Sequence, residues 1–169
     1  MINFQHDILP LKNLIFRTAL RIVLNREEAE DIVQDTLMKL WQKRDELAQV
    51  ANLEAFALAS ARNLAIDRKE KMENRNISLD DTLHDRPDEG LTEGDRLMTQ
   101  QETRRLVADV INSLPEKQRT VIQLRDIEGK NYREIAEVLS ISESDVKVTL
   151  FRARNEVKEK IFQKKSFFL

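Results

Sequence analysis

The chain has 169 residues, of which 41% are apolar and 34% are charged, and its formal net charge at pH 7 is −2. This length and apolar fraction suffice to bury one sizeable hydrophobic core or two small ones. Cysteine is absent and the two histidines, His6 and His84, lie far apart, which excludes disulfides and disfavours a Cys/His zinc site, so no metal or other cofactor is expected. The chain shows no stretch of roughly 20 apolar residues that could span a bilayer and no apolar core of a signal peptide, so we expect a cytoplasmic location.

Helical periodicity dominates the sequence, which contains only three glycines and three prolines. It predicts an all-α fold, with two helical domains joined by a flexible acidic linker. Helices are predicted over residues 8–24, 25–47 and 53–72, and together they form a bundle that makes residues 1–73 one domain. The second of these helices carries one apolar stripe, whose last member is expected in the core: Ala29, Ile32, Val33, Leu37, Leu40 and Trp41.

Acidic residues are concentrated in the middle of the chain. Residues 74–98 hold seven acidic and three basic side chains, whereas residues 99–169 hold 14 basic and 11 acidic ones. The stretch 74–95 also contains proline and glycine and has no helical period, which predicts a flexible linker. A second helical domain is predicted over residues 96–169, beginning with a helix over residues 96–112.

Residues 131–154 have the pattern of two short helices around a tight turn. Each helix has its own start signal, Asn131 with Glu134 and Ser142 with Asp145, in which a capping side chain satisfies free amides of the first turn. The pattern is typical of a helix-turn-helix DNA reader, and a helical hairpin within an ordinary core is the alternative. Apolar residues recur at helical spacing on both sides of the turn: Ile135, Ala136, Leu139, Ile141, Val146 and Leu150.

Positive charge gathers on and after the second helix of this hairpin. Residues 147–165 hold seven basic and two acidic side chains. Such an excess indicates a surface for phosphates, although a solvated basic helix end is the alternative for the last lysines. A hydrolase or nuclease is disfavoured, because the chain has no paired histidines and no glycine-rich phosphate loop.

Motifs in both predicted domains resemble the extracytoplasmic-function group of bacterial sigma-70 factors. The region-two helix that docks on the RNA polymerase clamp resembles residues 31–41, Asp-Ile-Val-Gln-Asp-Thr-Leu-Met-Lys-Leu-Trp. The following segment of that family, which opens and reads the minus-ten promoter element, resembles residues 61–67, Ala-Arg-Asn-Leu-Ala-Ile-Asp. Region four, which reads the minus-thirty-five element, resembles residues 114–119, Leu-Pro-Glu-Lys-Gln-Arg, and the hairpin. The resemblance covers nearly the whole chain and implies an alternative sigma factor, not an enzyme, that binds core RNA polymerase and promoter DNA and assists promoter melting.

This resemblance implies a polymerase-binding face on the second helix. Its polar side chains can accept hydrogen bonds from basic groups around an apolar centre. A merely solvated helix face is the alternative. The expected contact residues are Asp31, Gln34, Asp35, Leu37 and Met38.

The resemblance also implies a surface for the minus-ten element on the third helix. Opening promoter DNA requires phosphate contacts and a pocket for an unstacked base, to which the loop of residues 48–52 would contribute. Phe56 stands where family members often have tryptophan, so we expect a core role for it. Arg62 is expected to contact phosphate, with a pair to Asp67 or Asp31 as the alternative. The expected contact residues are Asn52, Arg62, Asn63, Arg68 and Lys69.

The second helix of the hairpin is expected to enter the major groove of the minus-thirty-five element with its N-terminal end. Asp145 is expected to be a capping residue rather than a reader of a base. The turn carries Ser140 where the family usually has glycine, and a left-handed conformation there would cost roughly 1 kcal/mol. The expected contact residues are Ser142, Glu143, Ser144, Lys147, Val148, Arg152 and Arg154.

A stand-alone helix-turn-helix regulator is the alternative function, and the resemblance over both domains favours the sigma factor. The family further implies an anti-sigma factor as a partner. A related hypothesis is that the two domains pack on each other in the free chain and hide their own DNA-binding faces.

Overall fold

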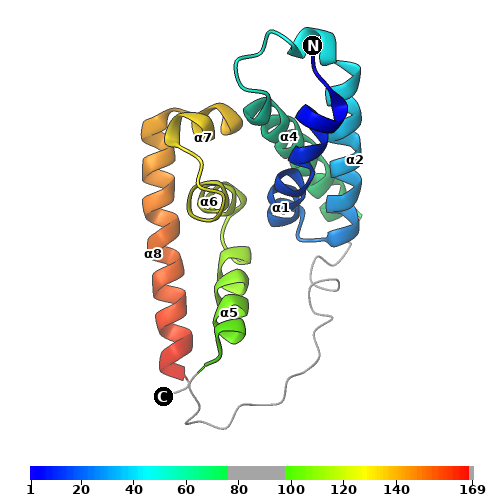
Figure 1. Ribbon diagram of the computed structural model, residues 1–169. Coiled ribbons are helices and arrows are strands. Elements are labelled where there is room, and N and C mark those ends of the chain that lie inside the picture. The colour runs from blue at the N-terminus through cyan, green and yellow to red at the C-terminus, as the bar shows by residue number, and fades with distance from the viewer. Residues whose placement is uncertain (76–97, 168–169) are drawn as a thin grey trace.

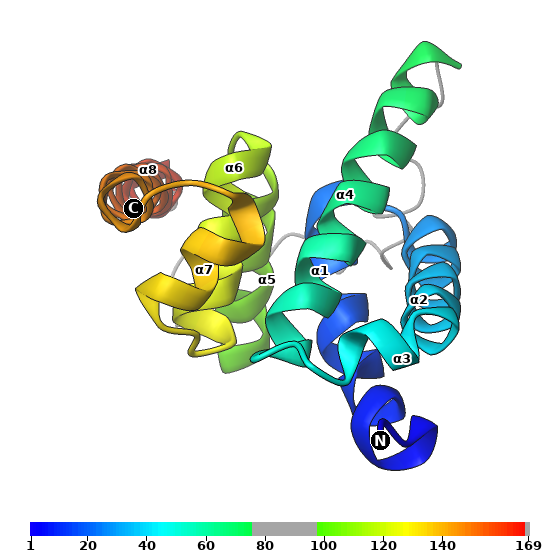
Figure 2. The same ribbon diagram turned by 90° about the horizontal axis from the view of Figure 1, so that it is seen from above.

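The computed structural model describes residues 1–75 and 98–167 of the chain, and in those two stretches all regular structure is helical. The prediction of an all-α fold is confirmed for them. Figures 1 and 2 show two groups of helices side by side, which we call the N-terminal unit (residues 1–75) and the C-terminal unit (residues 98–167). Most of the predicted linker, residues 74–95, lies outside the described residues. In the described part of the chain, no helix has the length and apolar character that crossing a membrane requires.

The N-terminal unit consists of two short turns followed by a bundle. Its elements are η1 (Phe4–Ile8), η2 (Leu9–Leu11), α1 (Lys12–Val23), α2 (Arg26–Gln42), α3 (Arg44–Leu47) and α4 (Leu53–Asn74). The predicted first helix begins later than expected, because the chain around Pro10 forms a 3₁₀ turn before the α-helix starts. The third helix begins as predicted, since the side chain of Asn52 accepts a hydrogen bond from the amide of Ala55 and caps α4.

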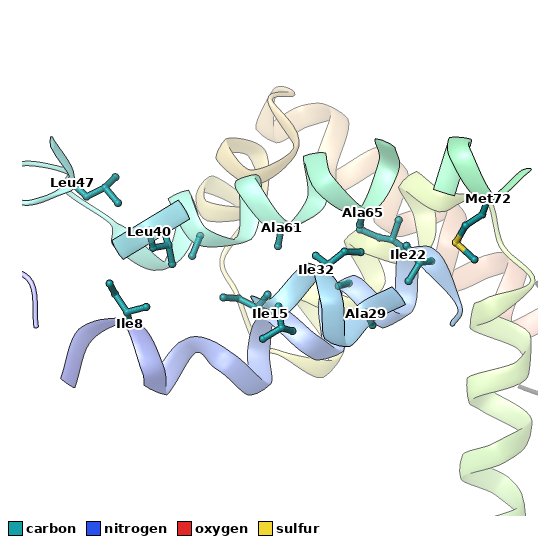
Figure 3. Packing of buried hydrophobic residues seen from close by; sticks show 14 residues of the cluster. Ile8, Ile15, Ile22, Ala29, Ile32, Leu40, Leu47, Ala61, Ala65 and Met72 are labelled. Atoms are coloured by element: carbon teal, nitrogen blue, oxygen red, sulfur yellow. The ribbon is translucent and has the colours of Figure 1, made fainter. Parts of the chain in front are cut away.

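A core of aliphatic side chains holds this bundle together. Ile15, Ile22, Ile32 and Leu40 are fully buried between α1, α2 and α4, and Figure 3 shows them facing Ala61 and its neighbours across the bundle. Small residues on α4, Ala57, Ala61 and Ala65, let the helices approach closely. The apolar stripe predicted on the second helix is buried over most of its length.

Trp41 is an exception to that stripe, and its predicted place in the core is wrong. Its side chain is 40% exposed. Its ring contacts Phe4 edge to face, with 5.7 Å between ring centroids, and the guanidinium of Arg44 lies 4.1 Å from the centroid of the indole. The stripe ends in the last turn of α2, where the ring packs on Phe4 and Arg44 near the surface instead of entering the core.

The C-terminal unit is built around a long final helix. Its elements are α5 (Gln100–Asn112), α6 (Glu116–Ile122), η3 (Gln123–Ile127), α7 (Tyr132–Leu139) and α8 (Glu143–Phe167). Thr99 and Glu102 form a capping box at the start of α5, later than the predicted start near residue 96. Figure 1 shows α5 lying along α8, with α6 and α7 at the upper end of the pair.

The predicted helix-turn-helix is present as α7, a turn and α8. Asn131 accepts a hydrogen bond from the amide of Glu134, and Ser142 accepts one from the amide of Asp145, so both predicted start signals are confirmed. Ser140 ends α7 in the left-handed region at φ 55°. The conformation usually given to glycine is therefore adopted by serine in this turn.

The two units are in contact along what we call the seam. The N-terminal unit contributes α1 and α4 to it, and the C-terminal unit contributes α6, η3 and α7. Ala55 and Leu58 of α4 are buried in the hydrophobic cluster of the C-terminal unit rather than in that of their own bundle. The hydrophobic cluster of the C-terminal unit therefore extends across the seam.

Candidate nucleic-acid interface

The N-terminal end of α8 is the most accessible of the predicted contact surfaces. Most of the residues that were predicted there to read DNA are exposed, and the side chain of Val148 is 47% exposed. The cap at Ser142 satisfies the amide of Asp145, so the first turn is fixed without a contact from the N-terminal unit. The structure brings these residues together on one open helix end: Ser142, Glu143, Ser144, Lys147, Val148 and Arg152.

Tyr132 gathers cations beside this helix end. The guanidinium of Arg125 lies 4.5 Å from the centroid of the tyrosine ring, and the ammonium of Lys147 lies 5.5 Å from it. Arg154 is held apart by a two-point pair with Asp126, with contacts of 2.5 and 3.0 Å. Hydrogen bonds to this carboxylate raise the pKa of Arg154. Lys147 is thus oriented by an aromatic face, whereas Arg154 must release Asp126 before it can give a full contact to phosphate.

Asp145 has a different role from the one predicted. The cap is provided by Ser142, and the carboxylate of Asp145 instead accepts hydrogen bonds from the ammonium of Lys117 at 2.9 and 3.0 Å and from the hydroxyl of Thr149 at 3.1 Å. The hydrogen bond from Lys117 is the main reason why the pKa of Asp145 is lowered. Asp145 therefore links α8 to α6. Because its carboxylate already accepts these hydrogen bonds, it is poorly placed to accept one from a DNA base.

The residues predicted for the minus-ten element are divided among several partners. Asn52 caps α4, and Asn63 is exposed on the same helix. Lys69 lies 3.8 Å from the carboxylate of Glu73 one turn later. The other two, Arg62 and Arg68, each bind carboxylates that the predictions did not pair with them.

Arg68 braces α4 against the acidic face of α2. Its guanidinium lies 2.6 Å from Glu28, 2.7 Å from Asp31 and 3.5 Å from Asp35. A residue predicted to bind DNA therefore neutralises two of the carboxylates predicted to bind the polymerase. Gln34 and Met38 remain exposed on that face, and Leu37 is half-buried.

Arg62 is bound across the seam. Its guanidinium makes two contacts with the carboxylate of Glu116, at 3.1 and 3.2 Å, and the two side chains are only 14% and 18% exposed. Neither of the predicted intrahelical or intrabundle alternatives, Asp67 and Asp31, is its partner. Glu116 also accepts a hydrogen bond from the hydroxyl of Thr120 at 2.8 Å. A short and largely desolvated pair of this kind keeps Arg62 away from solvent phosphate.

A cavity of about 590 Å³ lies next to the loop that was predicted to receive an unstacked base. The loop provides Val50, Ala51 and Asn52, and α4 provides Phe56 and its neighbours. The opposite wall belongs to α7 of the C-terminal unit and to the residue that caps it. Phe56 is half-buried, packs on the core of the N-terminal unit and also lines this cavity, so it combines the expected core role with a place in the pocket.

Sequence reasoning missed the arginines that hold the seam. Arg119 is 5% exposed and donates to the backbone carbonyls of Arg21 at 2.9 Å, Leu114 at 2.8 Å and Ile22 at 3.0 Å. These carbonyls of residues 21 and 22 belong to the last turn of α1, where no further helical amide is available to them. The motif of residues 114–119 includes this arginine, but nothing in the motif indicates a partner in the other domain.

Residues 8–75 match the family model for sigma-70 region 2, and residues 104–157 match the model for sigma-70 region 4. The chain is similar to the ECF RNA polymerase sigma-E factor of Haemophilus influenzae, with 30% identity over 82% of this chain and 77% of that protein. It is also similar to the ECF RNA polymerase sigma factor SigL of Mycobacterium tuberculosis, with 33% identity over 83% of this chain and 78% of that protein.

The fold is similar to that of the sigma factor RpoE solved in complex with the anti-sigma factor NepR from Bartonella quintana. The TM-score is 0.71 at 25% sequence identity, and the match covers 94% of this chain and 96% of that chain.

Proposed function

We propose that three separate surfaces of this chain direct RNA polymerase to promoters. The proposal proceeds from the family: the chain belongs to the sigma-70 family, as an extracytoplasmic-function sigma factor. The start of α8 would read the minus-thirty-five element. The face of α4 with the adjoining loop would receive the minus-ten element, and α2 would dock on the polymerase. The observation that carries this assignment is the open and independently capped N-terminal end of α8.

The assignment of α8 rests on its exposure and on the charges around it. Lys147 and Arg152 are exposed near the helix start and can anchor phosphates on either side of the groove. Val148 is exposed between them and can contact a thymine methyl group. Ser142, Glu143 and Ser144 precede them at the tip of the helix, where a recognition helix meets base edges.

The assignment of α4 rests on Asn63, on the cavity and on the basic residues that accompany them. Asn63 is exposed on α4, and Asn52 lines the cavity. Arg62, Arg68 and Lys69 would add phosphate contacts after exchanging their carboxylate partners for DNA. These side chains face partners within the chain in the structure, so this surface needs a rearrangement that α8 does not need.

The polymerase contact is proposed for the exposed side of α2. Gln34, Met38 and the outer edges of Asp31 and Asp35 are accessible there, and Leu37 adds a half-buried apolar centre. We further propose that the chain acts without catalysis of its own, in the cytoplasm where RNA polymerase works. An anti-sigma factor is the proposed regulator, because a structurally similar sigma factor was solved with one.

Run-off transcription with bacterial core RNA polymerase and a pooled promoter library tests this function. We expect transcripts that depend on the protein and share two spaced upstream elements. Arg152→Ala should lower their yield, whereas the matched control Glu159→Ala, exposed further along the same helix, should not. Specific duplex binding by the chain alone, without such transcripts, would favour a stand-alone regulator instead.

A further inference from the structure

We propose that a groove along α5 binds a small organic carboxylate, with its negative group beside Arg21 and its apolar body between α5 and η3. The site lies apart from the surfaces proposed for DNA and polymerase, so the inference goes beyond the function proposed above. Figures 1 and 2 show α5 on the side of the C-terminal unit that faces α1. Three observations carry the inference: the apolar lining of the groove, a partly buried arginine held by uncharged acceptors, and an excess of positive charge around it.

The groove follows one face of α5. Ile127 of η3 forms its other side, and this large apolar side chain is 48% exposed. The cavity has a volume of about 380 Å³, which is within the range of sites for small ligands. The lining residues on α5 recur at helical spacing and therefore stand in one row along the helix: Gln100, Thr103, Arg104, Val107, Ala108 and Ile111. The half of this row nearer the end of α5 is apolar, so the groove offers an apolar bed of a size suited to a small molecule.

Arg21 lines the groove where α5 ends. Its guanidinium donates to the side-chain oxygen of Asn112 at 2.7 Å and to that of Gln123 at 2.8 Å, and both acceptors are uncharged. These two bonds do not use all the donors of the guanidinium. Glu128, a nearby carboxylate, is already bound by Arg17 and by the amide of Gln123. A partly buried cation ordinarily has an anion beside it, because removing an unpaired charge from water is costly. The open groove is the place where such an anion can reach Arg21.

Positive charge prevails at this end of the groove. Burial lowers the pKa of Arg21, and the charge of Arg119 lowers it further, while the attraction of Glu128 offsets this only in part. Arg119 itself donates to backbone carbonyls, and Glu116, the carboxylate that acts most on it, is bound by Arg62. The two desolvated cations therefore share too little negative charge, and an added anion would stabilise both.

The rest of the groove shows the same preference for negative charge. Arg104 is exposed and lines the groove two turns before its apolar end. The acidic residues of α5, Glu102 and Asp109, are not among the residues that line it. A negatively charged ligand would therefore meet attraction along the whole groove.

The chemistry of the lining selects a carboxylate with an apolar body. A planar guanidinium matches the two oxygens of a carboxylate, which lie in one plane with it. Val107, Ala108 and Ile111 of α5 and Ile127 of η3 present only hydrocarbon side chains to the ligand. A phosphate or sulfate ion alone would leave this apolar surface uncovered, whereas an acyl or aryl group would bury it. The ligand class is therefore a monocarboxylate with a compact acyl or aryl body.

Isothermal titration calorimetry of the full chain with octanoate tests the site, and octanamide is the neutral compound of the same shape. We expect octanoate to bind at one site and octanamide to bind at least about tenfold more weakly, because the amide has no charge to pair with Arg21. Arg21→Gln should remove this preference. Ala108→Trp, which fills the groove and keeps the arginine, should abolish the binding of octanoate. Arg133→Gln, at an exposed position of α7, is the matched control and should bind octanoate as the wild type does.

A single thiol locates the bound compound, because the chain contains no cysteine of its own. Ile127→Cys places the thiol on the side of the groove opposite α5. Its reaction with iodoacetamide, a neutral reagent, is followed with and without octanoate. We expect saturating octanoate to slow this reaction several-fold. The thiol of Gln49→Cys, on an exposed loop of the N-terminal unit, should react at the same rate in both conditions.

Several results would overturn the site. They are the absence of octanoate binding up to millimolar concentrations, equal binding of octanoate and octanamide, unaltered binding in Ala108→Trp, and equal slowing of both thiols. Binding that appears only after the acidic side chains of residues 76–97 are changed to amides would also overturn it, in favour of the chain's own segment as the occupant. Transcription by the wild-type chain is measured separately, so its success or failure is independent of these results.

Discussion

The start of α8 and the middle of α4 are both proposed to bind promoter DNA, but the molecule presents them in opposite ways. On α8 the contact residues are exposed, with Arg154 the one held by a carboxylate, and the helix end is capped by its own serine. On α4 the equivalent arginines are bound to carboxylates, and one wall of the adjoining cavity is formed by another helix. The surface proposed to read duplex DNA is therefore exposed in the chain as it stands. The arginines proposed to bind the minus-ten element, by contrast, already have carboxylate partners within the chain.

Of the substitutions that separate the two surfaces, Arg119→Met in the seam is expected to have the largest effect, which is on the free energy of unfolding. The change leaves three backbone carbonyls without a donor in a covered site, so the free energy of unfolding should fall by about 3 kcal/mol. Urea denaturation followed by circular dichroism measures it. Arg104→Met, at an exposed position of α5, is the control and should change stability little. A loss below about 1 kcal/mol for Arg119→Met would mean that water replaces the arginine at the helix end.

Glu116→Gln should have the next largest effect. The pair with Arg62 is largely desolvated, and removing its charge should weaken the seam by about 1 to 2 kcal/mol while the amide oxygen keeps the bond from Thr120. Arg62 would then be available, so binding of single-stranded minus-ten DNA by the complex with core polymerase should be maintained or strengthened. Weaker binding of that strand by Glu116→Gln would contradict a covering role for the pair. Glu156→Gln, at an exposed position of α8, is a matched change outside the seam and the proposed DNA contacts.

Acid should weaken the seam through Glu128. Burial alone would raise its pKa, but hydrogen bonds from Arg17 and Gln123 and the nearby positive charges outweigh burial and lower the pKa. A carboxyl with a lowered pKa in the folded state contributes stability above its ordinary range and loses that contribution as the pH falls through the folded value. Stability measured from pH 7 downward should therefore decline in the acidic range below the ordinary pKa of glutamate. The decline should be smaller in Glu128→Gln, and identical profiles would remove Glu128 from this account.

The smallest effect concerns the open surface. Tyr132→Leu removes the ring that orients Lys147, a contact of about 0.5 to 1 kcal/mol at an exposed site, so binding of minus-thirty-five DNA should weaken only a few-fold. Tyr132→Phe keeps the ring and should bind like the wild type. Fluorescence anisotropy at two salt concentrations measures both variants. Equal loss in the phenylalanine variant would show that the hydroxyl, rather than the ring, matters.

Local features of the fold could be predicted because their causes lie within a few residues. Asn131 and Ser142 cap helices as expected, since a capping side chain and the amide it serves are three residues apart. The left-handed Ser140 follows from the position of the turn between two amphipathic helices. The all-α fold follows from the same periodicity.

The arrangement of the candidate site could not be predicted to the same degree. The partner of Arg62 is 54 residues away, and the carbonyl acceptors of Arg119 are more than 90 residues away, at separations of 97 and 98. No local spacing encodes such pairs, because they depend on how the two units meet. Trp41 was misplaced for a related reason: its spacing continued the stripe, but at the end of α2 its ring packs on Phe4 and Arg44 near the surface. Which of these residues touch DNA or polymerase stays a prediction.

Arg119 donates its hydrogen bonds across the seam to backbone oxygens rather than to side chains. Its acceptors across the seam are the main-chain oxygens of Arg21 and Ile22, which any residue at those positions would supply as long as α1 ends there. Substitutions at these two positions would therefore spare this contact, whereas lengthening α1 by one turn would abolish it by giving the oxygens helical partners. The length of a helix, more than its composition, would then determine whether related chains can close in this way.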